Sequence, residues 1–122
     1  MNAKRILIVD DSTTNNILLQ SILEEEDFKV DVAFSGNEAI KLIHRQLPNL
    51  ILLDIMMPEI DGISLLRELR ANEQTRAIPV IMVTAKDDEY SREESMLAGA
   101  NGFLTKPIDV DLVVQKVKSL VS

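Results

Sequence analysis

The chain has 122 residues, of which 46% are hydrophobic, so it is long enough to fold around one core and too apolar to be disordered. Its net charge of −7 argues against nucleic acid as a direct partner, because binding phosphates requires a basic face. The absence of cysteine excludes disulfides and thiolate metal sites. No apolar run is long enough for membrane insertion and no signal peptide opens the chain, so we expect a cytoplasmic protein.

Strand and helix patterns alternate five times along the sequence. Short apolar runs predict strands, in chain order, at 5–9, 29–34, 50–54, 78–85 and 102–107. Segments with helical spacing predict helices at 13–27, from 35 onward, at 62–72, at about 88–98 and after 109. Ser35 with Glu38 forms a capping-box pattern, Asp61 and Asp109 can cap the helices that follow them, and Gly99 can end the fourth helix.

This alternation predicts one α/β domain over residues 1–122. The central strands are continuously apolar, which is typical of a parallel sheet covered by helices on both faces. Right-handed crossovers then give a doubly wound, three-layer sandwich. Five strands favour the flavodoxin-like order 2-1-3-4-5, and the order 3-2-1-4-5 is excluded only weakly by the sequence.

Four of the predicted strands end in polar side chains. These are Asp10 and Asp11 after the first strand, Asp54 after the third, Thr84 on the fourth and Lys106 on the fifth. The carboxyl ends of parallel strands lie at one edge of the sheet, where such folds bind ligands at the switch point of the winding. In the favoured order this point falls between the first and third strands, so the three carboxylates are expected to face each other.

Three carboxylates with one ammonium form a site that attracts a hard cation, and Mg²⁺ fits best because it accepts carboxylates, waters and a phosphate oxygen. Thr84 can donate to an anionic oxygen, and Lys106 can pair with a phosphate. Each residue alone also has an ordinary interpretation, as a turn, a cap or a solvated charge. Together they supply what an aspartate needs to form an acyl phosphate.

The motifs extend this interpretation to a family. "VDD" (9–11), "GNEAI" (36–40), "LLDIMMPEIDG" (52–62), "VTA" (83–85) and "GFLTKP" (102–107) resemble the receiver domain of two-component response regulators, in particular the chemotaxis-type single-domain receivers. The resemblance implies that Asp54 accepts a phosphoryl group from a phosphohistidine of a histidine kinase or a phosphotransfer protein. It also implies that Asp10, Asp11, Asp54 and the main-chain carbonyl of Met56 hold Mg²⁺, with Mn²⁺ as an alternative.

The resemblance further implies a conformational switch. Thr84 and Lys106 would contact the phosphoryl group, Phe103 would follow Thr84 inward, and the Lys106–Pro107 peptide bond would be cis. The fourth helix, fifth strand and fifth helix would then form the output face, for a downstream effector, an output domain or a homodimer. An interpretation of Phe103 as an ordinary core residue stays open.

Met56 and Lys86 would lie at the rim of the site. Met56 cannot orient an attacking water, so we expect slow self-dephosphorylation. Two other functions remain open: a Mg²⁺-dependent phosphatase with an aspartate nucleophile, and a binding module that works without phosphorylation. Met56 argues against the phosphatase, because such enzymes usually have a second Asp at that position. The sequence also leaves open whether the chain acts alone or belongs to a longer regulator or hybrid kinase.

Overall fold

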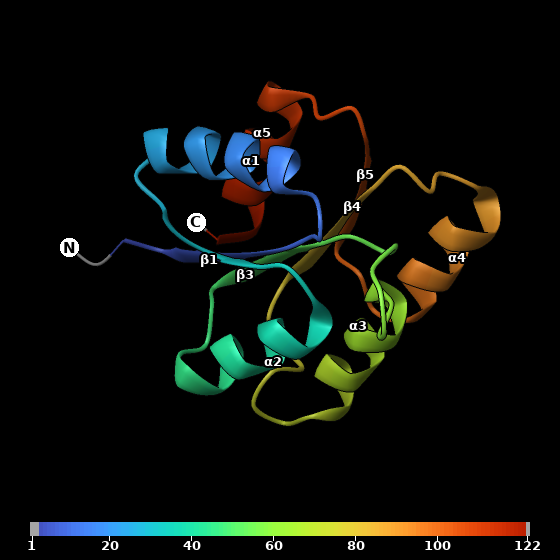
Figure 1. Cartoon of the computed structure of the whole chain (residues 1–122). Helices are drawn as coiled ribbons and strands as arrows, with labels where there is room; N and C mark the ends of the chain where they lie inside the picture. Colours follow the sequence, from blue (N-terminus) through green and yellow to red (C-terminus); the bar gives the residue numbers. More distant parts are fainter. Residues whose placement is uncertain (1–2, 122) are drawn as a thin grey trace.

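The computed structural model describes residues 3–121, in which five strands alternate with five helices (Figure 1). The strands are β1 (Arg5–Val9), β2 (Lys29–Ala33), β3 (Leu50–Leu53), β4 (Val80–Thr84) and β5 (Gly102–Thr105). The helices are α1 (Thr13–Glu25), α2 (Gly36–Arg45), α3 (Gly62–Ala71), α4 (Glu89–Leu97) and α5 (Val110–Val121). All ten predicted elements are present, and their ends differ from the prediction by two residues or fewer where the prediction gave both ends.

All strand pairs are parallel, and the strand order is β2-β1-β3-β4-β5. This confirms the flavodoxin-like order and excludes 3-2-1-4-5. The winding reverses between β1 and β3, which pair in the register Ile6 with Leu50 to Val9 with Leu53. The residues that follow Val9 and Leu53 therefore meet at the switch point.

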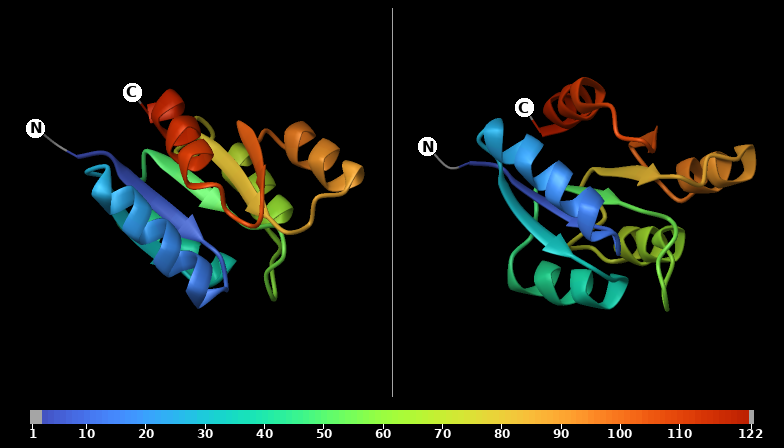
Figure 2. Two further views of the ribbon diagram at one scale, coloured as in Figure 1. Left: turned by 90° about the horizontal axis from the view of Figure 1, so that it is seen from above. Right: turned by 45° about the horizontal axis from the view of Figure 1, so that its top comes forward.

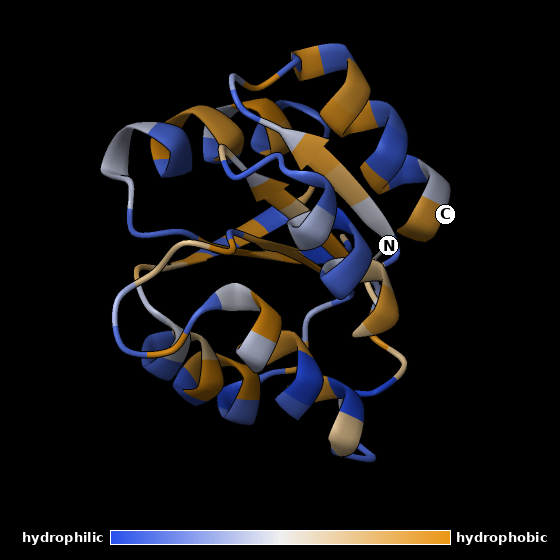
Figure 3. Ribbon diagram, turned by 90° about the vertical axis from the view of Figure 1, so that its right-hand side faces the viewer, coloured by the Kyte–Doolittle hydropathy of each residue, from blue (hydrophilic) through white to orange (hydrophobic). Residues whose placement is uncertain are grey.

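The hydrophobic core forms one layer on each face of the sheet. On one face, strand residues such as Ile8 and Leu52 pack against α1 and α5, through Leu19 and Val113 among others. On the other face, residues such as Leu53 pack against α2 and α3. Figure 2 shows the two helical layers, with α4 on the same side of the sheet as α3, and Figure 3 shows the hydrophobic strands enclosed between them.

The predicted helix starts are confirmed by their capping bonds. Asp61 Oδ1 accepts from Ser64 N at 2.8 Å, and Asp109 Oδ1 accepts from Leu112 N at 3.2 Å. Ser35 Oγ accepts from Glu38 N at 3.1 Å. The Glu38 carboxylate, however, accepts from the main-chain N–H of Phe34 rather than from that of Ser35. The second hydrogen bond of the capping box is therefore made to the residue before the N-cap and not to the N-cap itself.

Two helices end in a left-handed residue. Gly99 follows α4 with φ of 105°, and the N–H groups of Gly99 and Ala100 donate to Met96 O and Ser95 O. Asp27 occupies the equivalent position after α1 with φ of 69°, which is why this helix ends at Glu25 and not at 27. Both ends have the Schellman pattern, in which glycine is usual at this position.

Asp27→Gly is therefore expected to stabilise the protein, by about 0.5–1 kcal/mol, because glycine adopts a left-handed φ without steric cost and the helix end loses an unfavourable negative charge. Urea unfolding of the two proteins measures the difference. Glu24→Gly, in the last turn of the same helix, is the matched control and should destabilise the fold. An Asp27→Gly variant less stable than the wild type would contradict the assigned helix end.

Among residues 3–121, no helix combines the length and the apolar character that crossing a lipid bilayer requires.

Candidate functional site

Asp54 stands at the carboxyl end of β3, whose four residues are all buried. Its N–H donates to Val9 O at 2.9 Å, which extends the β1–β3 pairing by one residue, and the residue is 5% exposed. The chain then turns back so that Gly62 N donates to Ile55 O at 2.8 Å. The first residue of α3 thereby packs directly against the Asp54 main chain.

Asp10 and Asp11 follow β1 at the same edge of the sheet. Asp10 is 3% exposed, and its Oδ1 accepts from Ser12 N at 2.9 Å, whereas Asp11 is exposed to solvent. One carboxylate oxygen from each of Asp10, Asp11 and Asp54 lies within 4.8 Å of the other two. The structure thus brings together the three carboxylates that the sequence predicted to meet.

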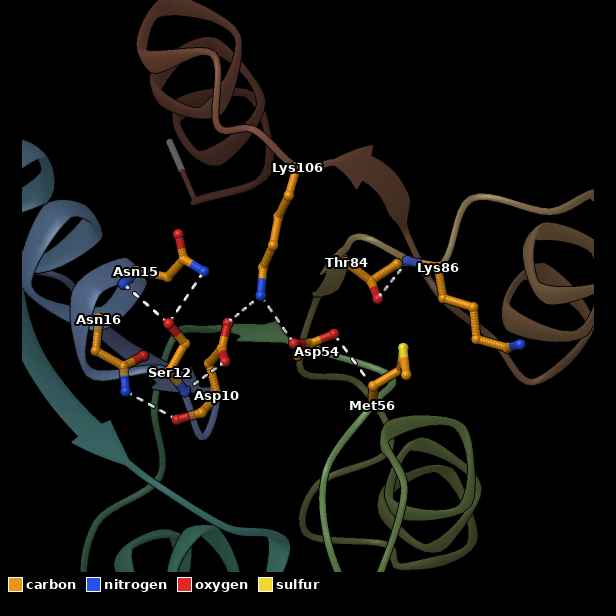
Figure 4. A network of polar contacts seen from close by, with 9 residues as sticks. All are labelled: Asp10, Ser12, Asn15, Asn16, Asp54, Met56, Thr84, Lys86 and Lys106. Atoms are coloured by element: carbon orange, nitrogen blue, oxygen red, sulfur yellow. Dashed lines mark hydrogen bonds and ion pairs between the residues drawn. The ribbon is translucent and has the colours of Figure 1, made fainter.

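Lys106 reaches this cluster from the residue after β5 (Figure 4). Its Nζ donates to Asp10 Oδ2 at 2.7 Å and to Asp54 Oδ2 at 2.9 Å. The Lys106 N–H donates to Thr84 O at 2.9 Å, so the lysine is held by the neighbouring strand. The Lys106–Pro107 peptide bond is cis, the isomer that the resemblance implies.

Burial and ion pairing oppose each other in this cluster. Burial raises the pKa of Asp10 above its usual range, although its hydrogen bonds with Lys106 and Ser12 act in the other direction. Burial alone would lower the pKa of the Lys106 ammonium, but its hydrogen bonds to Asp10 and Asp54 outweigh that effect and raise it. Lys106 therefore stays charged at neutral pH and offsets only part of the negative charge.

The donor set fits a divalent hard cation. Three carboxylates and no nitrogen or sulfur ligand are typical of Mg²⁺ or Mn²⁺. Asp10 and Asp54 form the buried side of the cluster, whereas the exposed Asp11 leaves the other side open to the waters that Mg²⁺ retains. Met56 N donates to Asp54 Oδ1 at 3.2 Å, which places the Met56 main chain beside the cluster.

Thr84 and Lys86 border the site on the β4 side. Thr84 is fully buried, and its Oγ1 accepts from Lys86 N at 3.1 Å. Met56 is 58% exposed, and with Lys86 it lines a cavity of about 580 Å³ that opens between α3 and α4. Figure 4 shows Thr84 and Met56 on the same side of Asp54, opposite Asp10.

Phe103, the predicted switch aromatic, lies on β5 and is partly buried. The Arg92 guanidinium of α4 stacks over its ring, 4.7 Å from the centroid, and Arg92 Nε donates to Asp87 Oδ1 at 2.6 Å. Asp87 belongs to the loop that follows Thr84, the last residue of β4. A chain of contacts therefore joins this loop to the ring of Phe103.

Three residues that shape the site were not identified from the sequence. Ser12 caps α1 and holds Asp10, Asn16 donates from its side chain to Asp10 O at 2.8 Å, and Gly62 packs on Asp54. Asn16 could have been found, because it lies three residues before Leu19 on the apolar face of α1. No local pattern identifies the role of Gly62, because its contact depends on how α3 packs.

The fold and the site together define a flavodoxin-like α/β protein with an acidic centre at its switch point. A family model described as "Response regulator receiver domain" matches residues 6–118, and the chain belongs to this family. It is therefore a receiver domain of two-component signalling.

Individual relatives agree with this assignment. The chain is 43% identical over 116 residues to the response regulator PleD of Caulobacter vibrioides, covering 95% of this chain and 26% of PleD. It is 36% identical to the protein PilH of Pseudomonas aeruginosa, covering 97% of this chain and 98% of PilH. The crystal structure of the receiver domain of a Pseudomonas aeruginosa sensor histidine kinase matches with a TM-score of 0.89 and 30% identity over 98% of both chains. That structure is described with a magnesium ion coordinated in its active site cleft.

Proposed function

We propose that this domain is a phosphorylation switch in which Asp54 accepts a phosphoryl group from a phosphohistidine of a histidine kinase or phosphotransfer protein. The observation that carries the proposal is the buried Asp54 carboxylate at the switch point, bound by Lys106 and accompanied by two further carboxylates. The only chemistry proposed for the domain is its own phosphorylation and dephosphorylation, so we do not regard it as an enzyme acting on a separate substrate.

In the transfer, one Asp54 oxygen attacks phosphorus while the P–N bond of the phosphohistidine breaks. The imidazole leaves with the electrons of that bond and takes up a proton. Lys106, already within 2.9 Å of Asp54, neutralises charge on the transferred group, and the Thr84 hydroxyl donates to one of its oxygens.

Asp10, Asp11, Asp54 and the Met56 carbonyl are the proposed ligands of Mg²⁺, with Mn²⁺ as an alternative. The bound cation would neutralise negative charge that builds up on the phosphoryl oxygens. The magnesium ion described for the Pseudomonas aeruginosa relative supports this assignment.

Incubation with Mg²⁺ and acetyl phosphate, followed by intact-mass measurement, tests the proposal. We expect one phosphoryl adduct per chain in the wild type and none in Asp54→Asn, which keeps the shape of the side chain but lacks the carboxylate nucleophile. Turnover of the donor without an adduct would favour an aspartate-based phosphatase. The absence of any reaction would favour a binding module that works without phosphorylation.

The proposed output face consists of α4, β5 and α5. Formation of the acyl phosphate would draw Thr84 toward the phosphoryl group and rearrange the loop that contains Asp87, which pairs with Arg92 over Phe103. Phe103 would then move inward and change the face that an effector, an output domain or a second copy of the chain contacts. The chain spans 26% of the length of PleD.

The phosphoryl group is expected to be long-lived. The Met56 side chain at the rim has no polar group that could orient a water for attack, and Lys86 on the other side can pair with the phosphoryl oxygens. After removal of the donor, the phosphorylated fraction should decay over many minutes, as measured by intact mass against time. Met56→Asn, which adds an amide at the same position, should shorten the decay. A wild-type lifetime of only seconds would refute this expectation.

A further inference from the structure

Asn16 is a buried amide on α1 that the proposed chemistry does not use. The residue is 2% exposed. Within residues 3–121, its Oδ1 and Ser95 Oγ are the buried side-chain polar atoms that have no hydrogen-bond partner. A half-satisfied buried amide costs stability, so its presence on an otherwise apolar helix face calls for a specific reason.

Among residues 3–121, the one hydrogen bond of the Asn16 side chain runs to the acidic cluster of Asp10, Asp11 and Asp54. Asn16 Nδ2 donates to the main-chain carbonyl of Asp10 at 2.8 Å. Because a carbonyl can only accept, this contact fixes which end of the amide faces Asp10. Figure 4 shows Asn16 beside Asp10, on the side away from Lys106.

Each of the three oxygen atoms of Asp10 therefore accepts a hydrogen bond. Lys106 binds Oδ2, the Ser12 N–H binds Oδ1, and Asn16 binds the main-chain oxygen. The first two contacts fix the carboxylate itself. The third fixes the peptide unit between Asp10 and Asp11, and with it the directions in which the two acidic side chains leave the chain.

We propose that Asn16 is a positioning residue of the metal site, which orients Asp10 and Asp11 through the main chain before the cation binds. The inference rests on the proposed function in one respect, that the cation is Mg²⁺. Groups that hold metal ligands in place commonly change metal affinity by about 10–100-fold when they are removed.

The neighbouring Asn15 provides a matched control. Its side chain donates to Ser12 Oγ at 3.3 Å, on the same turn of α1. No hydrogen bond between its side chain and Asp10 is present among residues 3–121. A general effect of altering an asparagine in the first turns of α1 would therefore appear in both variants, whereas a positioning effect would appear only at Asn16.

The test is a titration of the ¹⁵N-labelled full chain with MgCl₂, followed by NMR, combined with urea unfolding in EDTA. Asn16→Leu has a similar volume and removes the unpaired Oδ1, which offsets the cost of leaving Asp10 O without its donor, so the unfolding midpoint should stay close to that of the wild type. Its Kd for Mg²⁺ should nevertheless rise about tenfold, as should that of Asn16→Ala. Asn15→Ala should bind Mg²⁺ like the wild type.

A Kd for Mg²⁺ in Asn16→Leu equal to that of the wild type would overturn the proposal. This result is sufficient even if Asn16→Ala fails to fold. Equal weakening in Asn15→Ala and Asn16→Ala would also overturn it, because the effect would then belong to the helix and not to Asp10. If the wild type itself shows no response to Mg²⁺, the metal assignment under the proposed function fails first, and the role of Asn16 fails with it.

Discussion

Gly62→Ala is expected to destabilise the protein by about 3 kcal/mol or more, because the new methyl group cannot be accommodated beside rigid main chain. A Cβ at this position would lie 2.1 Å from Asp54 O and 2.9 Å from Ile55 Cα. These atoms belong to the proposed acceptor Asp54 and to Ile55, the two residues that directly follow β3. The α3 N-terminus would have to move away from β3, and Asp54 would be displaced with it, so phosphorylation should fall as well.

Gly36→Ala is the matched control for this experiment. Both glycines are the first residue of a helix, after the caps Ser35 and Asp61. A Cβ on Gly36 would meet the Ile60 Cγ2 methyl group at 2.2 Å, so the nearest atom belongs to a side chain that can shift and not to the main chain. Because alanine also favours the helix, we expect a change within about 1 kcal/mol for Gly36→Ala.

Urea unfolding and the phosphoryl adduct from acetyl phosphate are the two measurements. A Gly62→Ala protein with wild-type stability would show that α3 can shift without strain, and that the contact with Asp54 O is not a constraint on the site. Equal losses in the two alanine variants would instead point to a general effect of replacing glycine at a helix start.

The strands and their order could be predicted because they depend on burial. Leu50 to Leu53 are apolar and all buried, and the equivalent runs in β1 and β4 behave in the same way. Once the sheet is parallel and wound in the order 2-1-3-4-5, Asp10, Asp54 and Lys106 must converge. The convergence of these three side chains therefore follows from the strand order, which the alternation of strands and helices in the sequence had already indicated.

Features that depend on three-dimensional packing could not be predicted. The end of α1 depends on the left-handed Asp27, where the sequence shows an acidic residue and not the expected glycine. The role of Gly62 depends on the approach of α3 to β3, and the role of Asn16 depends on which main-chain oxygen its amide faces. In each case the residue type indicates a structural role only when the residue's neighbours in the folded structure are known.

Lys106→Met is expected to have opposite effects on stability and on metal binding. The ammonium is shared by Asp10 Oδ2 and Asp54 Oδ2, and both side chains are almost fully buried. Without it, two buried carboxylates face each other uncompensated, and the protein should lose about 3 kcal/mol of stability in EDTA. Saturating Mg²⁺ should restore most of this loss, because a bound divalent cation would compensate the charge of the same two carboxylates.

The affinity for Mg²⁺ should increase in the same variant, because the three carboxylates are then free of the competing Lys106 ammonium. Phosphorylation should nevertheless slow, since the incoming phosphoryl group loses the positive charge that binds it. Urea unfolding with and without Mg²⁺, an NMR titration and the rate of adduct formation measure these three effects.

Lys86→Met is the control for the measurement of stability. The Lys86 side chain is 47% exposed, and its Nζ lies 3.9 Å from Asp88 Oδ1. Removal of the Lys86 charge should therefore change the free energy of unfolding by no more than about 0.5 kcal/mol. An equal loss of stability for Lys106→Met in EDTA and in Mg²⁺ would show that the lysine acts by packing and not by its charge.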